Sequence, residues 1–396
     1  MSEESKHPAT GFATLPAGEF ERRVESVRAE LRVRGLDAGL AYGTQHVPGD
    51  VQYLTGYDPN IENAALLVLP ETLVVLGGAE GEAMFADGGR FGSWRNLSAF
   101  EIPFQDYGDT RFWTIGEVLT DILGRPPATI GLLSQRNVLS HEIVELAREA
   151  LGPAGTFVDA SEILFEARYR KSPAELEMFR VASQIATDAM RAMRAAVEPG
   201  VRELEVAAEC DRVVKKLGAY AHGFDTIVCA GDRINTIIGR ATNRVIRDGD
   251  LVMLGASPRY EGYTSALGRT VVAGRPSSAQ EAFLDHGAQA HLLASQALQL
   301  GRPAARVDLA ARDYLGSVGL AQYHAYGVGH GIGLSECLEW KTATSVSSYD
   351  LPAGIAMMLD VGLAGHPQFY GARHEDPFVI DHDGTTLRLT DLPMRL

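Results

Sequence analysis

The sequence predicts a two-domain protein in which an α/β domain is followed by an α+β domain. The 396 residues are enough for two or three domains, each with its own core. Strand and helix signals alternate through the first part of the chain, whereas the second part opens with a strongly capped helix. We therefore predict one domain over residues 1–167 and a second over residues 168–396.

The first domain has the pattern of a mixed sheet covered by helices. Helical periodicity and short apolar runs mark its elements. The predicted helices cover residues 20–34, 113–123 and 140–151, and the predicted strands residues 37–42, 64–69, 72–76 and 129–133. No glycine-rich phosphate loop opens any of these helices, so the sequence does not support a nucleotide site.

The second domain opens with the clearest local signal in the chain. Ser172 is expected as the N-cap of a helix, with Pro173 in its first turn and Glu175 completing a capping box. Further helices are predicted over residues 203–217, 278–300 and 307–318, and strands over residues 226–230, 251–257, 263–272, 355–361 and 368–380. Helices packed on one curved antiparallel sheet make an α+β domain.

Composition limits the partners of the protein. A hydrophobic fraction of 45% is typical of a globular protein, and a net charge of −15 argues against nucleic acid or an anionic membrane as a partner. The first residues lack the apolar core of a signal peptide, and no apolar run is long enough to cross a bilayer. The three cysteines form no spacing motif. We expect a cytoplasmic protein that acts on a small molecule.

Several short motifs, met in the same order along the chain, resemble the pita-bread hydrolases: methionine aminopeptidase, prolidase, aminopeptidase P and creatinase. They are residues 51–57 (VQYLTGY), 167–175 (ARYRKSPAE), 329–334 (GHGIGL) and 373–376 (RHED), together with a predicted β-hairpin over residues 249–270. Each motif alone is weak, but their common order is specific. The resemblance implies an α+β pita-bread C-terminal domain, preceded by a smaller α/β domain of the creatinase type, in a homodimer.

The hairpin lacks the side chains that hold metal in the metallopeptidases of this group. By resemblance, those enzymes carry one metal-binding aspartate on each strand, whereas this chain has Gly255 and Ala266 at these places. Neither residue has a donor atom, so a hard divalent cation would lose two oxygen ligands. We therefore expect no paired-metal site and no cofactor. One ion at His330, Asp360 and Glu375 is the lesser alternative.

His330, Glu375 and Asp360 are the predicted catalytic residues. By resemblance, His330 and Glu375 hold the family's histidine and glutamate places, and Asp360 replaces a glutamate. The ordinary pKa of histidine lies near neutral pH, so His330 can take and give a proton. Two carboxylates in one partly buried site repel each other, so one should hold a proton at neutral pH. The alternative is a structural network that pairs the carboxylates with nearby cations, Arg269, Arg373 or His374.

Two further histidines that the resemblance implies are missing. Cys337 stands at the place of one, seven residues after His330, and the loop over residues 235–245 contains none. The predicted substrate-binding residues lie on the hairpin and on loops: Tyr263, His222, Arg269, Asn235 and Asn60. Strand alternation favours the cavity face for Tyr263. Asn60 belongs to a loop that reaches the partner's site in creatinase-like dimers.

The function that we expect from these residues is a metal-independent, creatinase-like hydrolase. It would cleave a C–N bond in a small polar amide or amidine by proton transfer through His330, Glu375 and Asp360. Lyase chemistry on the same residues is equally consistent with the sequence. Two alternatives stay open, a ligand- or protein-binding pseudoenzyme and a mononuclear-metal Xaa-Pro-type peptidase, because a fold does not fix a function.

Overall fold

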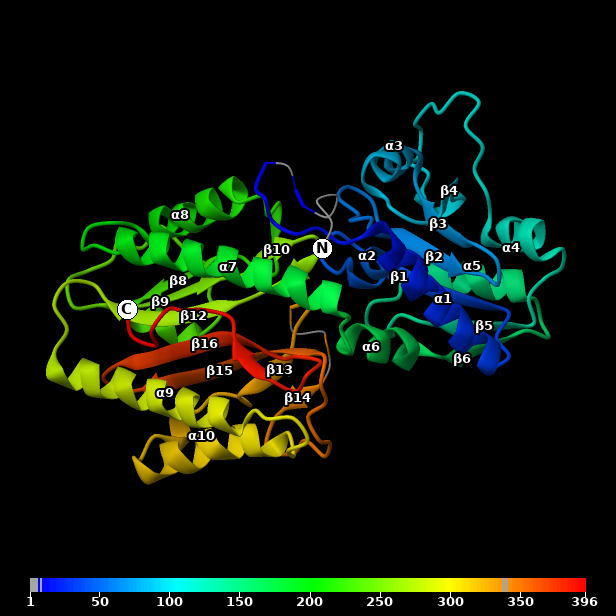
Figure 1. Cartoon of the computed structure of the whole chain (residues 1–396). Coiled ribbons are helices and arrows are strands. Elements are labelled where there is room, and N and C mark those ends of the chain that lie inside the picture. Colours follow the sequence, from blue (N-terminus) through cyan, green and yellow to red (C-terminus); the bar gives the residue numbers. More distant parts are fainter. Residues whose placement is uncertain (1–5, 8, 337–338, 340) are drawn as a thin grey trace. The chain divides into compact units, whose positions relative to one another are not determined.

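Two units make up the part of the chain that the structure, a computed structural model, describes: residues 6–7, 9–336, 339 and 341–396 (Figure 1). One unit is Leu15–Arg168, and the other is Tyr169–Leu396 together with the described residues before Leu15. A hydrogen bond of 3.0 Å from the Tyr260 hydroxyl to the carbonyl of Ala13 fixes this early segment to the second unit. No helix in the described residues is long and apolar enough to span a membrane.

The first unit is a six-stranded mixed sheet with helices. The strand order is β4-β3-β2-β1-β5-β6, with β2 antiparallel to both neighbours and the other pairs parallel. Its elements are α1 (Ala17–Val33), β1 (Ala38–Gly43), α2 (Gly49–Thr55), β2 (Ala64–Val68), β3 (Leu73–Gly77), α3 (Ala79–Gly88), β4 (Ser93–Asn96), α4 (Ile115–Leu123), β5 (Thr129–Leu132), α5 (His141–Leu151), β6 (Thr156–Asp159) and α6 (Ser161–Tyr169). The central strands β1, β2 and β3 are buried along their whole length, as continuous apolar runs predict.

The second unit is built on a curved antiparallel sheet with the order β14-β13-β15-β16-β12-β9-β8, and β17 pairs with β16. Its helices are α7 (Pro173–Ala196), α8 (Glu203–Lys216), α9 (Ser278–Ala297) and α10 (Ala305–Ser317). Its strands are β7 (Ala221–His222), β8 (Ile227–Ala230), β9 (Leu251–Ala256), β10 (Pro258–Tyr260), β11 (Tyr263–Thr264), β12 (Leu267–Val272), β13 (Gly329–Gly331), β14 (Thr342–Ala343), β15 (Ile355–His366), β16 (Tyr370–Ile380) and β17 (Thr386–Arg388). Helices α7 and α8 lie on one side of this sheet and α9 and α10 on the other (Figure 1). The predicted α+β pita-bread domain, preceded by an α/β domain, is confirmed.

Two alternating sets of side chains separate the faces of β15 and β16. Met357 and Leu359 pack into the core that α9 and α10 cover, whereas Ala356 and Met358 pack with Leu176 of α7. Because side chains alternate along a strand, Asp360 and Glu375 belong to the α7 face and their neighbours His374 and Asp376 to the α9 face. The α7 face is therefore the one that carries the predicted catalytic carboxylates.

The capped start of α7 forms as the sequence predicts. Ser172 Oγ accepts a hydrogen bond of 3.2 Å from the Glu175 backbone, and a Glu175 carboxylate oxygen accepts one of 2.9 Å from the Ser172 backbone. This reciprocal pair satisfies two backbone donors that the first turn of a helix leaves free.

The predicted hairpin also forms, but its second strand is interrupted. Glu261 and Gly262 form the turn with φ angles of 49° and 85°, a combination for which a glycine is favoured. The predicted strand over residues 263–272 is wrong at its centre: β11 joins β10 and β7 in a small separate sheet, and only β12 enters the large one. The backbone N–H and the hydroxyl of Thr264 both donate to the carbonyl of Gly333, at 2.7 and 2.8 Å, and this binds β11 away from the sheet.

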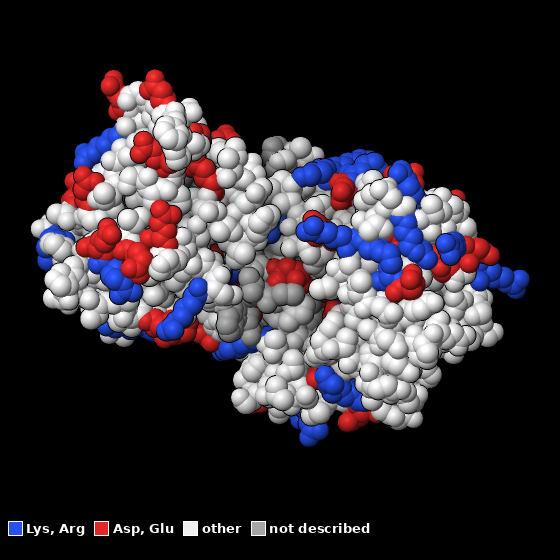
Figure 2. All heavy atoms as spheres, turned by 180° about the vertical axis from the view of Figure 1, so that it is seen from behind, with Lys and Arg blue, Asp and Glu red and all other residues white. Residues whose placement is uncertain are grey.

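Acidic and basic side chains are interspersed on the face that Figure 2 shows, rather than separated into two fields.

We expect acid to destabilise the second unit through the buried imidazole of His291 on α9. Burial lowers the pKa of His291 to about 4, from an ordinary value of 6.5. Between these pH values the unfolded chain binds the extra proton, so this contribution is complete above pH 6.5 and is lost as the pH falls towards 4. At pH 5.0, urea unfolding should show a loss of about 2 kcal/mol relative to pH 7.5 that His291→Gln removes. The exposed His141→Gln is the control. An unchanged pH dependence in His291→Gln would contradict this assignment.

Candidate active site

Asp360 and Glu375 form the centre of the candidate site. They are directly opposed in the pairing of β15 with β16, and both are buried. Opposed residues in antiparallel strands project to the same face. On the other side of Glu375 lies Gly268 of β12, where an added Cβ would come within 3.1 Å of a Glu375 carboxylate oxygen. The glycine therefore leaves room for the Glu375 side chain.

Arg373 connects the two carboxylates. Its Nη2 lies 3.0 Å from Asp360 Oδ2 and 2.9 Å from Glu375 Oε1, and all three side chains are almost fully buried. Burial alone would lower the pKa of Arg373, but the two carboxylates raise it well above its ordinary value. Arg373 is thus a permanent cation in the site. Its contacts with Asp360 and Glu375 form the ion-pair network that the sequence offered as an alternative reading of these carboxylates.

A tyrosine completes the network. The Tyr326 hydroxyl donates to Asp360 Oδ2 at 2.6 Å, and Arg373 Nε donates to the same oxygen at 3.1 Å. Gly362 makes this approach feasible, because an added Cβ there would lie 2.6 Å from the Tyr326 hydroxyl oxygen. Asp360 Oδ1 makes no hydrogen bond with the part of the chain that the structure describes. One oxygen of Asp360 is therefore held by two donors, and the other can accept a proton or a ligand.

Glu375 is an acid whose charge the protein disfavours. Burial raises its pKa well above the ordinary value, the nearby carboxylates of Asp360 and Glu336 add to the rise, and Arg373 opposes it. Within the described residues, Oε2 makes no hydrogen bond and Oε1 has only the ion pair with Arg373. Such a carboxyl group either holds a proton or binds a cation that the protein itself does not provide.

His330 approaches the carboxylates from β13. Its Nδ1 lies 3.1 Å from the carbonyl of Gly331, and its Nε2 lies 3.8 Å from Glu336 Oε1. His330, Glu336 and Glu375 each offer one ligand atom, and the three atoms lie within 4.8 Å of one another. Sequence reasoning missed Glu336, although its place six residues after His330 in a glycine-rich segment was visible in the sequence.

These donors fit one divalent metal ion. One imidazole nitrogen and two carboxylate oxygens are suitable ligands for a first-row divalent ion, and Glu375 offers a buried oxygen without a hydrogen bond among the described residues. The hairpin adds none: Ala266 packs in an apolar cluster with Phe179 and Met358, and an added Cβ at Gly255 would lie 3.0 Å from Ile227. The ligand set therefore suits a single ion better than a pair.

Three predicted substrate-binding residues have structural partners instead. The buried Tyr263 hydroxyl donates to Glu175 Oε1 at 2.7 Å, and so reaches the capping box of α7. Arg269 Nη2 lies 2.6 Å from Asp376 Oδ1 on the α9 face, where burial lowers the pKa of the guanidinium. Asn235 is exposed, and its side chain accepts a hydrogen bond of 2.9 Å from the backbone of Gly365.

The other two predicted substrate-binding residues belong to elements other than β13, β15 and β16. His222 is in β7 and faces Asp211 of α8. Asn60 is exposed and belongs to the Leu15–Arg168 unit. Cys337 lies outside the described residues. The structure therefore groups His330, Glu375 and Asp360, and it adds Glu336, Arg373 and Tyr326 to them.

Comparisons with known proteins agree with a hydrolase site. The sequence profile of metallopeptidase family M24 matches residues 177–382. The Xaa-Pro dipeptidase of Pyrococcus furiosus is 30% identical over 262 residues, which are 66% of this chain and 73% of that protein. The Xaa-Pro dipeptidase of Pyrococcus horikoshii is 30% identical over 234 residues, which are 59% of this chain and 66% of that protein.

Solved structures share the fold over nearly the whole chain. An X-Pro aminopeptidase from Thermotoga maritima has a TM-score of 0.81 at 22% identity and covers 94% of this chain and 98% of its own. A prolidase from Pyrococcus horikoshii has a TM-score of 0.79 at 23% identity, with 93% and 98% covered. At these identities the likeness shows the fold alone.

These matches overturn two expectations from the sequence. The expected metal-independent, creatinase-like function is wrong, because the matching profile is that of a metallopeptidase family and the relatives are named Xaa-Pro dipeptidases. The expected lack of a cofactor is wrong for the same reason. The hairpin donors are not required for a metal site, because His330, Glu336 and Glu375 bring three donor atoms together without them.

Proposed function

The chain belongs to metallopeptidase family M24, and on this premise we propose that it is an Xaa-Pro-type peptidase with one divalent metal ion. The proposed ligands are His330, Glu336 and Glu375. The substrate class is a small peptide with proline after the bond that is cleaved, in keeping with the names of the relatives. The observation that carries the proposal is the convergence of these three ligand atoms within 4.8 Å of one another.

The ion would activate a water molecule and polarise the peptide carbonyl. Asp360 is the proposed proton acceptor: Tyr326 and Arg373 hold its Oδ2, so that Oδ1 is presented in a fixed orientation. Arg373 balances the charges of Asp360 and Glu375, and so keeps two neighbouring carboxylates in one buried site. His330 Nε2 and Glu336 Oε1, 3.8 Å apart, would hold the ion together with Glu375.

Metal dependence is the direct test of this function. We expect chelated protein to lose hydrolysis of a Leu-Pro dipeptide, and added Mn²⁺ to restore it along a hyperbolic curve that requires one ion per active chain. Hydrolysis of Leu-Ala should be weak under the same conditions. Glu209→Gln, on the exposed side of α8, serves as a control with unchanged activity. Full hydrolysis by metal-free protein would refute the metal site, and a sigmoidal dependence on Mn²⁺ would refute the single ion.

The expected homodimer and cytoplasmic location remain predictions from the sequence, as does the place of Asn60 near a partner's site.

A further inference from the structure

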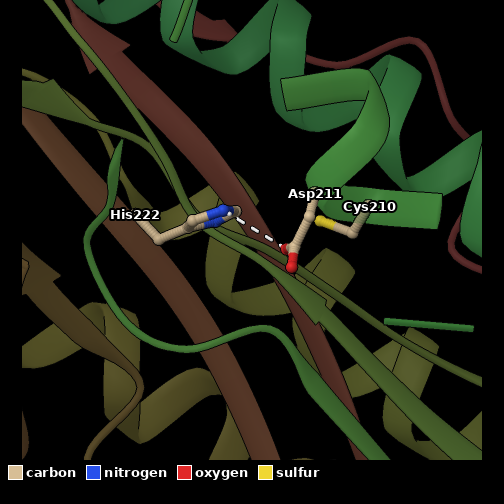
Figure 3. A group of neighbouring side chains, drawn as sticks. All are labelled: Cys210, Asp211 and His222. Atoms are coloured by element: carbon tan, nitrogen blue, oxygen red, sulfur yellow. Dashed lines mark ion pairs between the residues drawn. The ribbon is translucent and has the colours of Figure 1, made fainter. Parts of the chain in front are cut away.

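A second group of potential metal ligands lies in the same unit, at the junction of α8 with β7. Cys210 and Asp211 lie in the middle of α8, and His222 is the last residue of β7, the next strand along the chain. Figure 3 shows the His222 ring and the Asp211 carboxylate pointing toward one another, with Cys210 beside Asp211. His222 Nε2 lies 3.3 Å from Asp211 Oδ1, and the three ligand atoms lie within 4.8 Å of one another. The fold thus brings a thiol, a carboxylate and an imidazole to one point.

This donor set matches a zinc-like ion. Bond lengths near 2.0–2.3 Å in a tetrahedral zinc site place neighbouring donors about 3.3–3.7 Å apart. The separation of His222 Nε2 from Asp211 Oδ1 already lies in this range, and the ligand atom of Cys210 lies within 4.8 Å of those of the other two residues. A thiolate selects zinc or cobalt over magnesium, calcium and manganese, which prefer oxygen ligands. The group therefore differs in metal preference from the carboxylate-rich site at His330.

The surroundings of the three residues suit an ion that enters from solvent. The Asp211 side chain is 56% exposed and that of His222 19%, so a fourth ligand position can face water. Thr226 Oγ1 donates to Asp211 Oδ1 at 2.9 Å and orients the carboxylate. The second ring nitrogen of His222, Nδ1, is buried and has no hydrogen-bond partner among the described residues. The imidazole therefore contacts Asp211 through its other nitrogen, Nε2.

Nearby charges of both signs face His222. Asp211 and Asp225 attract a cation, whereas Lys215 and Arg259 repel it. Two of these groups have partners of their own, since Lys215 donates to the carbonyl of Tyr220 and Asp225 pairs with Arg240. Burial raises the pKa of the Cys210 thiol to about 12, so an ion has to displace its proton on binding.

We propose that Cys210, Asp211 and His222 form an accessory site for a divalent ion of the zinc class, separate from the site at His330, Glu336 and Glu375. The two groups share no residue, and β7 belongs to the small sheet, whereas β13 and β16 belong to the large one. An ion bound there links the middle of α8 to β7 and so stabilises the second unit.

Cobalt binding tests the accessory site independently of peptidase activity. The full chain, stripped of metal, is titrated with Co²⁺, and the near-ultraviolet charge-transfer absorption of a thiolate–cobalt bond is recorded. We expect the band in the wild type and in His330→Ala, and its displacement by Zn²⁺. Cys210→Ser should abolish the band, and His222→Gln and Asp211→Asn should each weaken Co²⁺ affinity at least about tenfold.

Matched thiol variants distinguish the outcomes. Cys229→Ser removes the other buried cysteine among the described residues and should leave the band unchanged. Cys337→Ser should leave it unchanged as well. A missing band in the wild type, a band that survives Cys210→Ser, or a band lost only with Cys337→Ser would each overturn the proposal. If Cys210→Ser does not fold, the partly exposed His222 and Asp211 variants still decide it, because unchanged affinity in both would refute the site.

Discussion

Replacement of Arg373 by methionine is expected to lower the free energy of unfolding by about 3–5 kcal/mol at neutral pH. Arg373 is the one cation with ion pairs to both Asp360 and Glu375 within the described residues, and all three side chains are 4% exposed or less. Its removal leaves two buried carboxylates without their countercharge, which costs far more than the loss of an exposed ion pair. Urea unfolding followed by circular dichroism measures the change.

A double variant shows whether the loss has this cause. The double variant Arg373→Met with Asp360→Asn also removes the Asp360 charge that Arg373→Met leaves unpaired. Its loss of unfolding free energy should therefore be clearly smaller than the sum of the losses in the two single variants. Arg191→Met, which removes a largely exposed cation paired with Asp188 and Asp391, should change stability only slightly. Additive losses in the double variant would show that Arg373 acts through packing and not through charge.

Glu375→Gln is expected to reduce kcat for Leu-Pro hydrolysis at least about a hundredfold, which corresponds to about 2.7 kcal/mol of activation free energy. The amide keeps the size of the side chain but loses the anionic oxygens that are proposed to bind the ion. Because burial disfavours the charge of Glu375, and because Arg373 keeps its ion pair with Asp360, the neutral variant should fold as well as the wild type. Activity and Mn²⁺ affinity should fall while the unfolding midpoint stays constant.

The next residue on β16 provides the contrasting control. Asp376 is equally buried but lies on the α9 face, where it pairs with Arg269 and Arg388 at 2.6 Å each. Asp376→Asn should therefore destabilise the protein and leave kcat unchanged in the fraction that is folded. If Asp376→Asn impaired kcat as severely as Glu375→Gln, the division of the two faces into a reactive and a structural side would be wrong.

The fold was accessible from the sequence because it depends on local patterns. Uninterrupted apolar runs predicted the buried strands β2 and β3, and the Ser172–Glu175 capping box predicted the start of α7. The hairpin over residues 249–270 was expected from the family resemblance, and Glu261 and Gly262 form its turn. What the pattern could not anticipate was the break between β11 and β12, since the carbonyl that binds Thr264 comes from Gly333, far along the chain.

The contacts of the site residues were predicted less well. Alternation assigns side chains to the two faces of a strand, but it does not say which elements pack against each face. The resemblance placed Asp360 and Glu375 at one site, and the two residues pair directly across β15 and β16. Alternation favoured a cavity position for Tyr263, whose hydroxyl donates to Glu175. Arg269 and Arg373 were equivalent candidates in the sequence. Only the packing assigns Arg373 to the carboxylates on the α7 face and Arg269 to Asp376 behind them.

By itself, the sequence determined the two-part fold and the lack of side-chain donors at Gly255 and Ala266. It also determined that His330, Asp360 and Glu375 all lie in the second part of the chain. The tertiary structure decided that Glu336 approaches His330, that Arg373 joins the two carboxylates, and that Cys210 and Asp211 meet His222. These encounters depend on side chains from separate elements reaching the same point within a few ångströms. Periodicity along one element carries no information about such distances, and close packing alone fixes them.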